Sequence, residues 1–149
     1  MYPIVLGIHN IVRWIVVILG VIALVQAYRG WLGKQPWSES ARKVQVFFSS
    51  AADTQLLLGL LLYFGLSHIV KGAFNDFGAA MGNAETRFFA LEHAFYMLLA
   101  VVFIHVGTAR SKKAETDADK YRQAAIWFTL AFLIVLLGMP WSRPLLPHF

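Results

Sequence analysis

Cysteine is absent from this chain of 149 residues, and charged residues are scarce. Without cysteine the chain has no disulfide, no thiol nucleophile, no cysteine-held iron–sulfur cluster and no covalent c-type haem attachment. Charged residues make up 14% of the sequence, against about 25% in an ordinary soluble domain. The absence of cysteine excludes the thiol-based chemistries, and the low content of charged residues argues against a soluble globular protein.

Four apolar blocks occupy most of the chain, at residues 4–27, 44–67, 88–108 and 124–139. The first three reach the length of about 20 residues that a helix needs to cross a bilayer core, and the fourth is slightly shorter. The runs are continuous rather than alternating, which excludes a membrane β-barrel. The first block is too long for the core of a signal peptide and lacks a basic leader, so we expect it to be a retained span.

We therefore predict an all-α fold, a single domain over residues 1–149 that forms a transmembrane up-and-down four-helix bundle. The expected helices cover approximately residues 4–28, 39–68, 86–110 and 118–139. His148 is expected to lie in a tail exposed to solvent.

The basic residues indicate how the helices are oriented in the membrane. Nine of the 13 lysines and arginines lie in or beside the first and third connections, three lie on the other side, and Arg13 lies within a span. The positive-inside rule then places these two connections in the cytoplasm and both termini outside. We expect a multi-pass protein of the bacterial inner membrane that contacts lipid and binds no nucleic acid.

Ionisable residues inside the apolar blocks are the candidate functional residues, because such groups normally face a bundle interior and have a partner. His9 and Arg13 are four residues apart and share one helix face. His9 and His93 each lie about five residues from the outer end of their helix, roughly 8 Å deep. Arg13 and Asp53 lie deeper, near the midplane. We predict that His9 and His93 share a level and that Arg13 and Asp53 form a structural ion pair.

Two inward-facing histidines at one level favour a single b-type haem, held near the outer leaflet by bis-histidine ligation from His9 and His93. His105 cannot serve the same iron, because it lies twelve residues from His93, about 18 Å along the helix. No other helix offers a histidine at the level of His105, so one haem is the maximum. His68, at the end of its helix, is expected to be interfacial and is a second choice of partner for His9.

A haem also needs polar support from the protein. The second ring nitrogen of each ligand requires an acceptor, for which the candidates are Glu92, Asn10 and a backbone carbonyl. The haem propionates require cations, for which the candidates are Arg13 and Arg87. Without haem, the same histidines would form a hydrogen-bonded network between helices. A non-haem metal held by His9, Glu92 and His93 is disfavoured, because residues 92 and 93 point about 100° apart on the helix.

The motifs of the chain resemble those of a family. His9-x3-Arg13-Trp14, Asp53-x-Gln55-Leu56-Leu57-Leu58-Gly59 and Arg87-Phe88-Phe89-x2-Glu92-His93 occur in three successive spans, and Pro140-Trp141 closes the fourth. Together they resemble a group of small bacterial four-span membrane proteins often labelled cytochrome b. The resemblance covers nearly the whole chain and implies haem b and electron transfer. Some members carry a histidine where this chain has Asp53, so the resemblance implies no ligand from that helix here.

Three functions are consistent with these residues. The first is electron transfer through one haem b, with a quinone or a membrane redox complex as partner. The second is a non-enzymatic accessory subunit of a larger membrane complex, in which the polar residues fix helix register without haem. Association into a homo-oligomer is a separate expectation and is consistent with the sequence. The third is a proton-coupled carrier using Arg13, Asp53 and Glu92, which we rank last because no repeat or broken span is visible.

Overall fold

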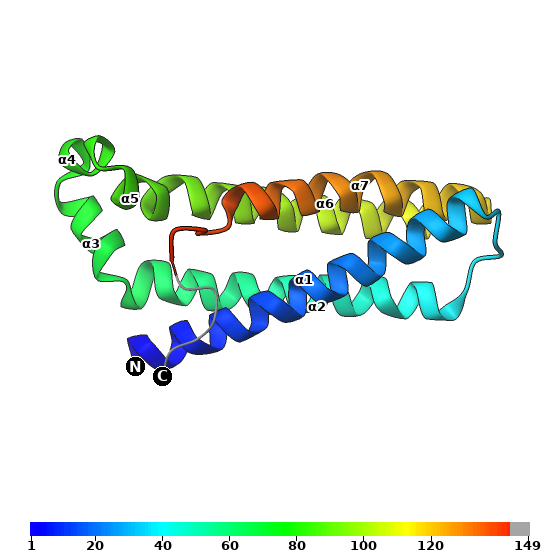
Figure 1. Ribbon diagram of the computed structural model, residues 1–149, viewed down its shortest axis with the longest axis horizontal. Helices are drawn as coiled ribbons and strands as arrows, with labels where there is room; N and C mark the ends of the chain where they lie inside the picture. Colours follow the sequence, from blue (N-terminus) through cyan, green and yellow to red (C-terminus); the bar gives the residue numbers. More distant parts are fainter. Residues whose placement is uncertain (144–149) are drawn as a thin grey trace.

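The computed structural model describes residues 1–143, and every regular element in that part is helical. Four long helical segments run alternately up and down (Figure 1). They are α1 (Tyr2–Leu32), α2 (Glu39–Leu60) with its continuation η1 (Leu61–Leu66), α5 (Ala84–Arg87) with η2 (Phe88–Glu92) and α6 (His93–Lys113), and α7 (Asp117–Gly138). Each is long and apolar enough to cross a membrane. The predicted all-helical architecture with four long spans is confirmed. His148, which was expected to lie in a solvent-exposed tail, is outside the described residues.

The helix ends follow local capping chemistry. The Ser38 hydroxyl accepts a hydrogen bond from the Ala41 amide at the start of α2, at 3.1 Å. The Thr116 hydroxyl does the same for the Asp119 amide at the start of α7, also at 3.1 Å. Such caps satisfy amides that have no partner within the first helical turn. These starts agree with the predicted ones, whereas α1 and α6 continue three to four residues beyond their predicted ends, to Leu32 and Lys113.

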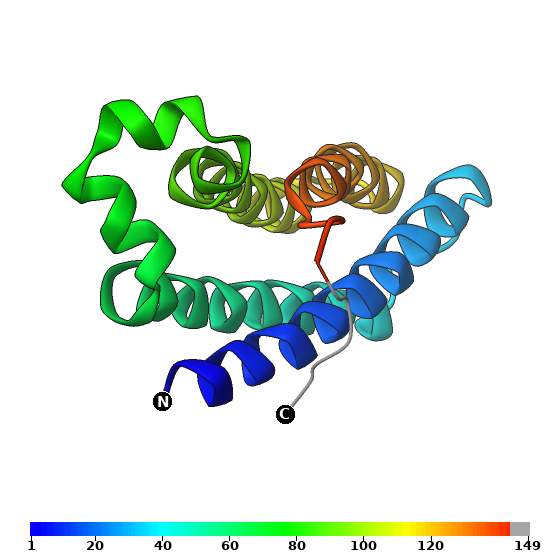
Figure 2. The same cartoon turned by 60° about the vertical axis from the view of Figure 1, so that its left-hand side comes forward.

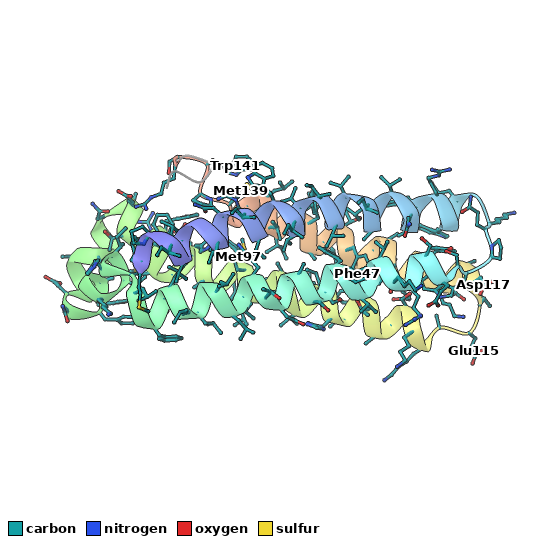
Figure 3. All side chains as sticks on the ribbon, turned by 90° about the horizontal axis from the view of Figure 1, so that it is seen from below. Phe47, Met97, Glu115, Asp117, Met139 and Trp141 are labelled. Carbon is teal, nitrogen blue, oxygen red and sulfur yellow. The ribbon has the colours of Figure 1, made fainter. Side chains whose placement is uncertain are left out.

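The connection between the second and third spans folds into two short helices, α3 (His68–Asn75) and α4 (Phe77–Gly82). Ser67 and Asp76 cap them through their side-chain oxygens. The two helices and α5 close one end of the bundle, beside the N-terminus (Figure 1). We call this the α3–α5 end. The opposite end carries the connections 33–38 and 114–116 and most of the basic residues, and we call it the basic end; Glu115 and Asp117 lie there (Figure 3).

Small side chains and two aromatic rings form the bundle core. The buried face of α1 includes Gly20, Ala23 and Ala27, which allow close helix approach. Phe48 of α2 and Phe128 of α7 meet edge to face at 5.4 Å between ring centroids. Helix α1 packs against α2 and α7, and α6 packs against α7 and α2. Toward the α3–α5 end, α1 and α2 lie on one side and α6 and α7 on the other (Figure 2).

Candidate functional site

A cavity of about 630 Å³ lies between these two helix pairs. This volume is within the range of roughly 300–1,000 Å³ that organic ligands and cofactors occupy in proteins. Its wall is mainly apolar and includes Met97 and Met139, which lie toward the α3–α5 end (Figure 3). A few polar side chains interrupt this wall, among them His9, Asn10, Arg13, Gln55, His93 and Arg143. The cavity therefore has the composition of a site for a largely apolar ligand with a few oriented polar contacts.

His9 of α1 and His93 of α6 face each other in this cavity. Their ring centroids are 6.5 Å apart and the ring planes are inclined at 68°. The two residues come from helices that run in the same direction. Because each helix rises about 1.5 Å per residue from the α3–α5 end, residues at a similar distance along the two helices lie at a similar depth. The structure thus brings together the two histidines that were predicted to share a level.

The protonation of His93 is fixed by a backbone carbonyl. His93 Nδ1 lies 2.7 Å from the carbonyl oxygen of Gly138, at the end of α7. A carbonyl only accepts, so Nδ1 carries the proton and Nε2 of the neutral ring keeps a lone pair. The last carbonyls of a helix have no intrahelical partner, and His93 satisfies one of them. Glycine permits this approach, because a Cβ at position 138 would lie 2.8 Å from Tyr96 Cβ.

His9 is held differently. Its Nε2 lies 3.1 Å from the side-chain amide nitrogen of Gln55 on α2. Its Nδ1 and the Gln55 amide oxygen are both buried without a hydrogen-bond partner among the described residues. Exchanging the amide oxygen and nitrogen would let the Gln55 oxygen accept from Nε2–H, but the buried amide nitrogen and His9 Nδ1 would then lack partners. A buried polar atom without a partner costs about 1–3 kcal/mol, so the His9 ring is available for a further ligand.

Glu92 and Arg87 do not line the cavity, in contrast to their predicted roles. Arg87 Nε donates to Glu92 Oε1 at 2.8 Å, and its Nη1 donates to the Met81 carbonyl at 3.2 Å. Glu92 precedes His93 and points away from it by about one hundred degrees of helix rotation. The acceptor for His93 is instead the backbone carbonyl of Gly138, one of the three predicted alternatives. No group of three or more metal-ligating side chains converges in the described part of the chain, so the set of His9, Glu92 and His93 is not assembled.

Arg143 is a cavity residue that sequence reasoning missed. Its guanidinium lies 4.4 Å from the Phe89 ring centroid and is paired with the Glu85 carboxylate. The residue was counted only as a charge on the outer side, because nothing in the sequence shows that the chain turns back over the bundle after Pro140. Arg13 lines the cavity as predicted, and His68 does not; the His68 ring is exposed at the start of α3, 6.3 Å from that of Tyr2.

Asp53 bonds His105 rather than its predicted partner Arg13. His105 Nε2 lies 2.7 Å from Asp53 Oδ1. Two more pairs join the same faces of α2 and α6, with Gln45 to Ser111 at 3.2 Å and Ser49 to Thr108 at 3.1 Å. We call these three pairs the polar ladder. Positions 45, 49 and 53 are spaced four residues apart along the side of α2 that contacts α6, and none of them lines the cavity, whose α2 wall includes Ala52, Gln55, Leu56 and Gly59.

Both π-helical segments border the cavity. Segment η2 ends at Glu92, directly before His93, so its wider turn sets the direction in which the histidine leaves the helix. The Tyr63 hydroxyl in η1 donates to the Ala90 carbonyl in η2 at 2.6 Å and ties the two segments together across the cavity end. Single π turns within α-helices are frequent at functional sites.

Replacing Tyr63 by phenylalanine should remove this tie and lower the stability of the protein by about 0.5–1.5 kcal/mol, the net value of one hydrogen bond. The measurement is thermal unfolding in detergent, followed by circular dichroism. Tyr96→Phe is the matched control, because no hydrogen bond from the Tyr96 hydroxyl is present in the described part of the chain. Equal unfolding temperatures for the two variants would show that the tie contributes nothing.

Comparison with protein family models, with curated proteins and with solved structures finds no match to this chain. The resemblance to the group labelled cytochrome b therefore stays a prediction from the motifs, and the function is argued from the site.

Proposed function

We propose that the chain binds one haem b in this cavity, with His9 and His93 as axial ligands, and transfers electrons. The observation that carries the proposal is the placement of two imidazoles on one largely apolar cavity. Two nitrogens that share an iron at about 2 Å each are about 4 Å apart, which places the ring centres roughly 6 Å apart. The centroids of His9 and His93 are 6.5 Å apart.

The surroundings of His93 fit the role of an axial ligand. Metal-ligating histidines usually donate their other ring N–H to a carboxylate or backbone carbonyl, which fixes the ring and its tautomer. The bond from His93 Nδ1 to the Gly138 carbonyl is of this kind and leaves Nε2 for the metal. Because the acceptor belongs to the backbone of α7, the fourth helix also takes part in the site.

His9 would have to give up its present contact to act as the second ligand. Its Nε2 is engaged by Gln55 and its Nδ1 is buried, so ligation requires the ring to release Gln55 or to turn about χ2. That torsion is broad in histidine, and the contact is a single bond. The orphaned Nδ1 supports the proposal, because the present arrangement leaves the ring incompletely satisfied.

The remaining residues of the cavity suit the rest of a haem. Arg13 lies on the wall and provides a guanidinium that can bind a propionate through two parallel hydrogen bonds. The apolar wall keeps water from the ligands, and burial of this kind is one determinant of a haem's reduction potential. A bound haem b supplies reversible one-electron transfer. The partner we propose is a quinone or a membrane redox complex that approaches the α3–α5 end.

The charge distribution supports an orientation for this chemistry. The basic end carries nine of the 13 lysines and arginines, and we propose on this ground that it lies in the cytoplasm of a bacterial inner membrane, with both termini outside. The haem would then lie in the outer half of the bilayer.

The test is the visible spectrum of the protein purified in mild detergent from cells supplied with haem precursor. We expect a Soret band, a sharp α-band on reduction and one haem per chain. A colourless protein would overturn the proposal. If that colourless protein also carried stoichiometric partner chains, the accessory-subunit hypothesis would take its place.

A further inference from the structure

The polar ladder ends in a hydrogen-bonded histidine–aspartate pair that lies on the outside of the bundle. Gln45, Ser49 and Ser111 are buried between α2 and α6. The side chains of Asp53 and His105 are 46% and 50% exposed. A carboxylate and an imidazole are therefore presented side by side on the lateral surface formed by α2 and α6. This pair lies away from the cavity, and the proposed haem chemistry does not use it.

The position of the pair along the spans makes this exposure costly. Asp53 lies ten residues from Lys43, and His105 lies five residues from Arg110, which correspond to about 15 Å and 8 Å along the helices. In a membrane both side chains would face hydrocarbon. An aspartate at the centre of a membrane helix costs roughly 2.5–3.5 kcal/mol, so such groups almost always face other protein. The exposed pair consequently indicates a protein surface that is covered in the membrane.

The stereochemistry of the pair identifies the covering partner. His105 Nε2 bonds Asp53 Oδ1, while His105 Nδ1 and Asp53 Oδ2 have no partner in the described part of the chain. In the ionised pair the imidazolium still offers one N–H and the carboxylate still offers one acceptor oxygen. A donor and an acceptor at the same depth are complementary to an identical copy turned by 180°. We propose that the chain forms a homodimer through this face, in which Asp53 of each copy accepts from His105 of the other.

The symmetry and the neighbouring residues are consistent with that arrangement. Two copies in one membrane with the same orientation are related by an axis along the membrane normal, which preserves depth and gives an isologous interface. Ser50 and Thr54 on α2 and Ala109 on α6 are exposed beside the pair. Small residues at this point allow α2 of one copy to approach α6 of the other closely. The inference depends on insertion in a membrane and not on the presence of haem.

Disulfide cross-linking tests the dimer directly, because the chain has no native cysteine. Two differently tagged copies are expressed together, one with Ser50→Cys and the other with Ala109→Cys, and the native membranes are oxidised. We expect a disulfide-linked dimer that carries both tags. Ile18→Cys on α1, also exposed at 56%, replaces Ser50→Cys in the control and should give no such dimer. Absence of the doubly tagged dimer, or linkage of these cysteines only to a different protein, would overturn the proposal.

A charge exchange separates the dimer contact from the fold of each chain. Asp53→His and His105→Asp, made singly, should each abolish the doubly tagged dimer, because each leaves two like groups at the interface. The double variant restores one carboxylate and one imidazole per copy and should restore the cross-link. Thermal unfolding shows whether the single variants still fold. If they do not, the cross-link of the double variant still tests the dimer contact. A cross-link that persists at full yield in both single variants would overturn the proposal.

Discussion

Replacing either His9 or His93 by alanine is expected to remove the sharp reduced α-band and most of the bound haem from the purified protein. Each substitution deletes one of the two imidazoles whose rings lie 6.5 Å apart. Among the polar side chains of the wall, Asn10 and Gln55 are poor ligands for haem iron compared with imidazole. The measurement is the reduced-minus-oxidised spectrum, together with the ratio of haem to protein.

The matched control for this experiment is His105→Ala. It removes the same type of side chain from the same helix, twelve residues away, or about 18 Å along the axis. Its spectrum should be that of the unmodified protein, whatever the effect on its oligomeric state. If His105→Ala lost as much haem as His93→Ala, or if His93→Ala kept a sharp α-band, the assignment of the ligands would be wrong.

The level of the two histidines was predictable because a helix has a fixed rise. His9 and His93 each follow the start of a span by a similar number of residues, and their helices run in the same direction, so the two residues lie at a similar depth. The length and composition of the four spans were predictable for a similar reason, since a bilayer sets the length of the apolar run that it can hold.

The partner of Asp53 was not predictable from depth. Arg13 and Asp53 lie at similar levels, yet pairing also depends on which faces of the helices meet, and the sequence does not state the order of helices around the bundle. A usable signal was nevertheless present. Polar residues recur every four positions in Gln45, Ser49 and Asp53, and a second polar series in His105, Thr108 and Ser111 matches it in the antiparallel direction. Two such series indicate one interface.

The backbone features of the site left no trace in the sequence at all. The acceptor for His93 is the carbonyl of Gly138, and every residue carries a carbonyl. The π segments before His93 and after Leu60 likewise depend on how the spans pack against α3 and one another. The side-chain pattern therefore does not predict the acceptor of His93 or the π segments, because the groups that determine them belong to the main chain.

Gly30 is the position where one added methyl group is expected to destabilise the bundle most clearly. A Cβ there would lie 2.4 Å from two ring atoms of Tyr121. That ring cannot simply move aside. It is buried, its centroid lies 4.7 Å from the Trp37 ring, and its hydroxyl donates to the Pro36 carbonyl at 3.1 Å and accepts from the Ser38 amide at 3.3 Å.

Gly30→Ala should therefore lower stability by about 1–3 kcal/mol, the usual cost of overpacking, even though alanine is the better helix former by roughly 1 kcal/mol. Thermal unfolding in detergent measures the change. Gly72→Ala is the control, since a Cβ at that helical position meets nothing within 4 Å and should be neutral or stabilising. An unfolding temperature for Gly30→Ala at or above that of the unmodified protein would refute the steric argument.

The same substitution should also loosen one particular segment. Tyr121 anchors the connection 33–38 through Pro36, Trp37 and Ser38, so displacement of its ring removes those contacts while the bundle is still folded. Amide hydrogen exchange should accelerate first in this connection, because local opening there no longer breaks the bonds to Tyr121. A uniform acceleration along all four spans would instead mean that Gly30→Ala acts through global unfolding alone. The pattern of exchange thus separates the loss of an anchor from the loss of general stability.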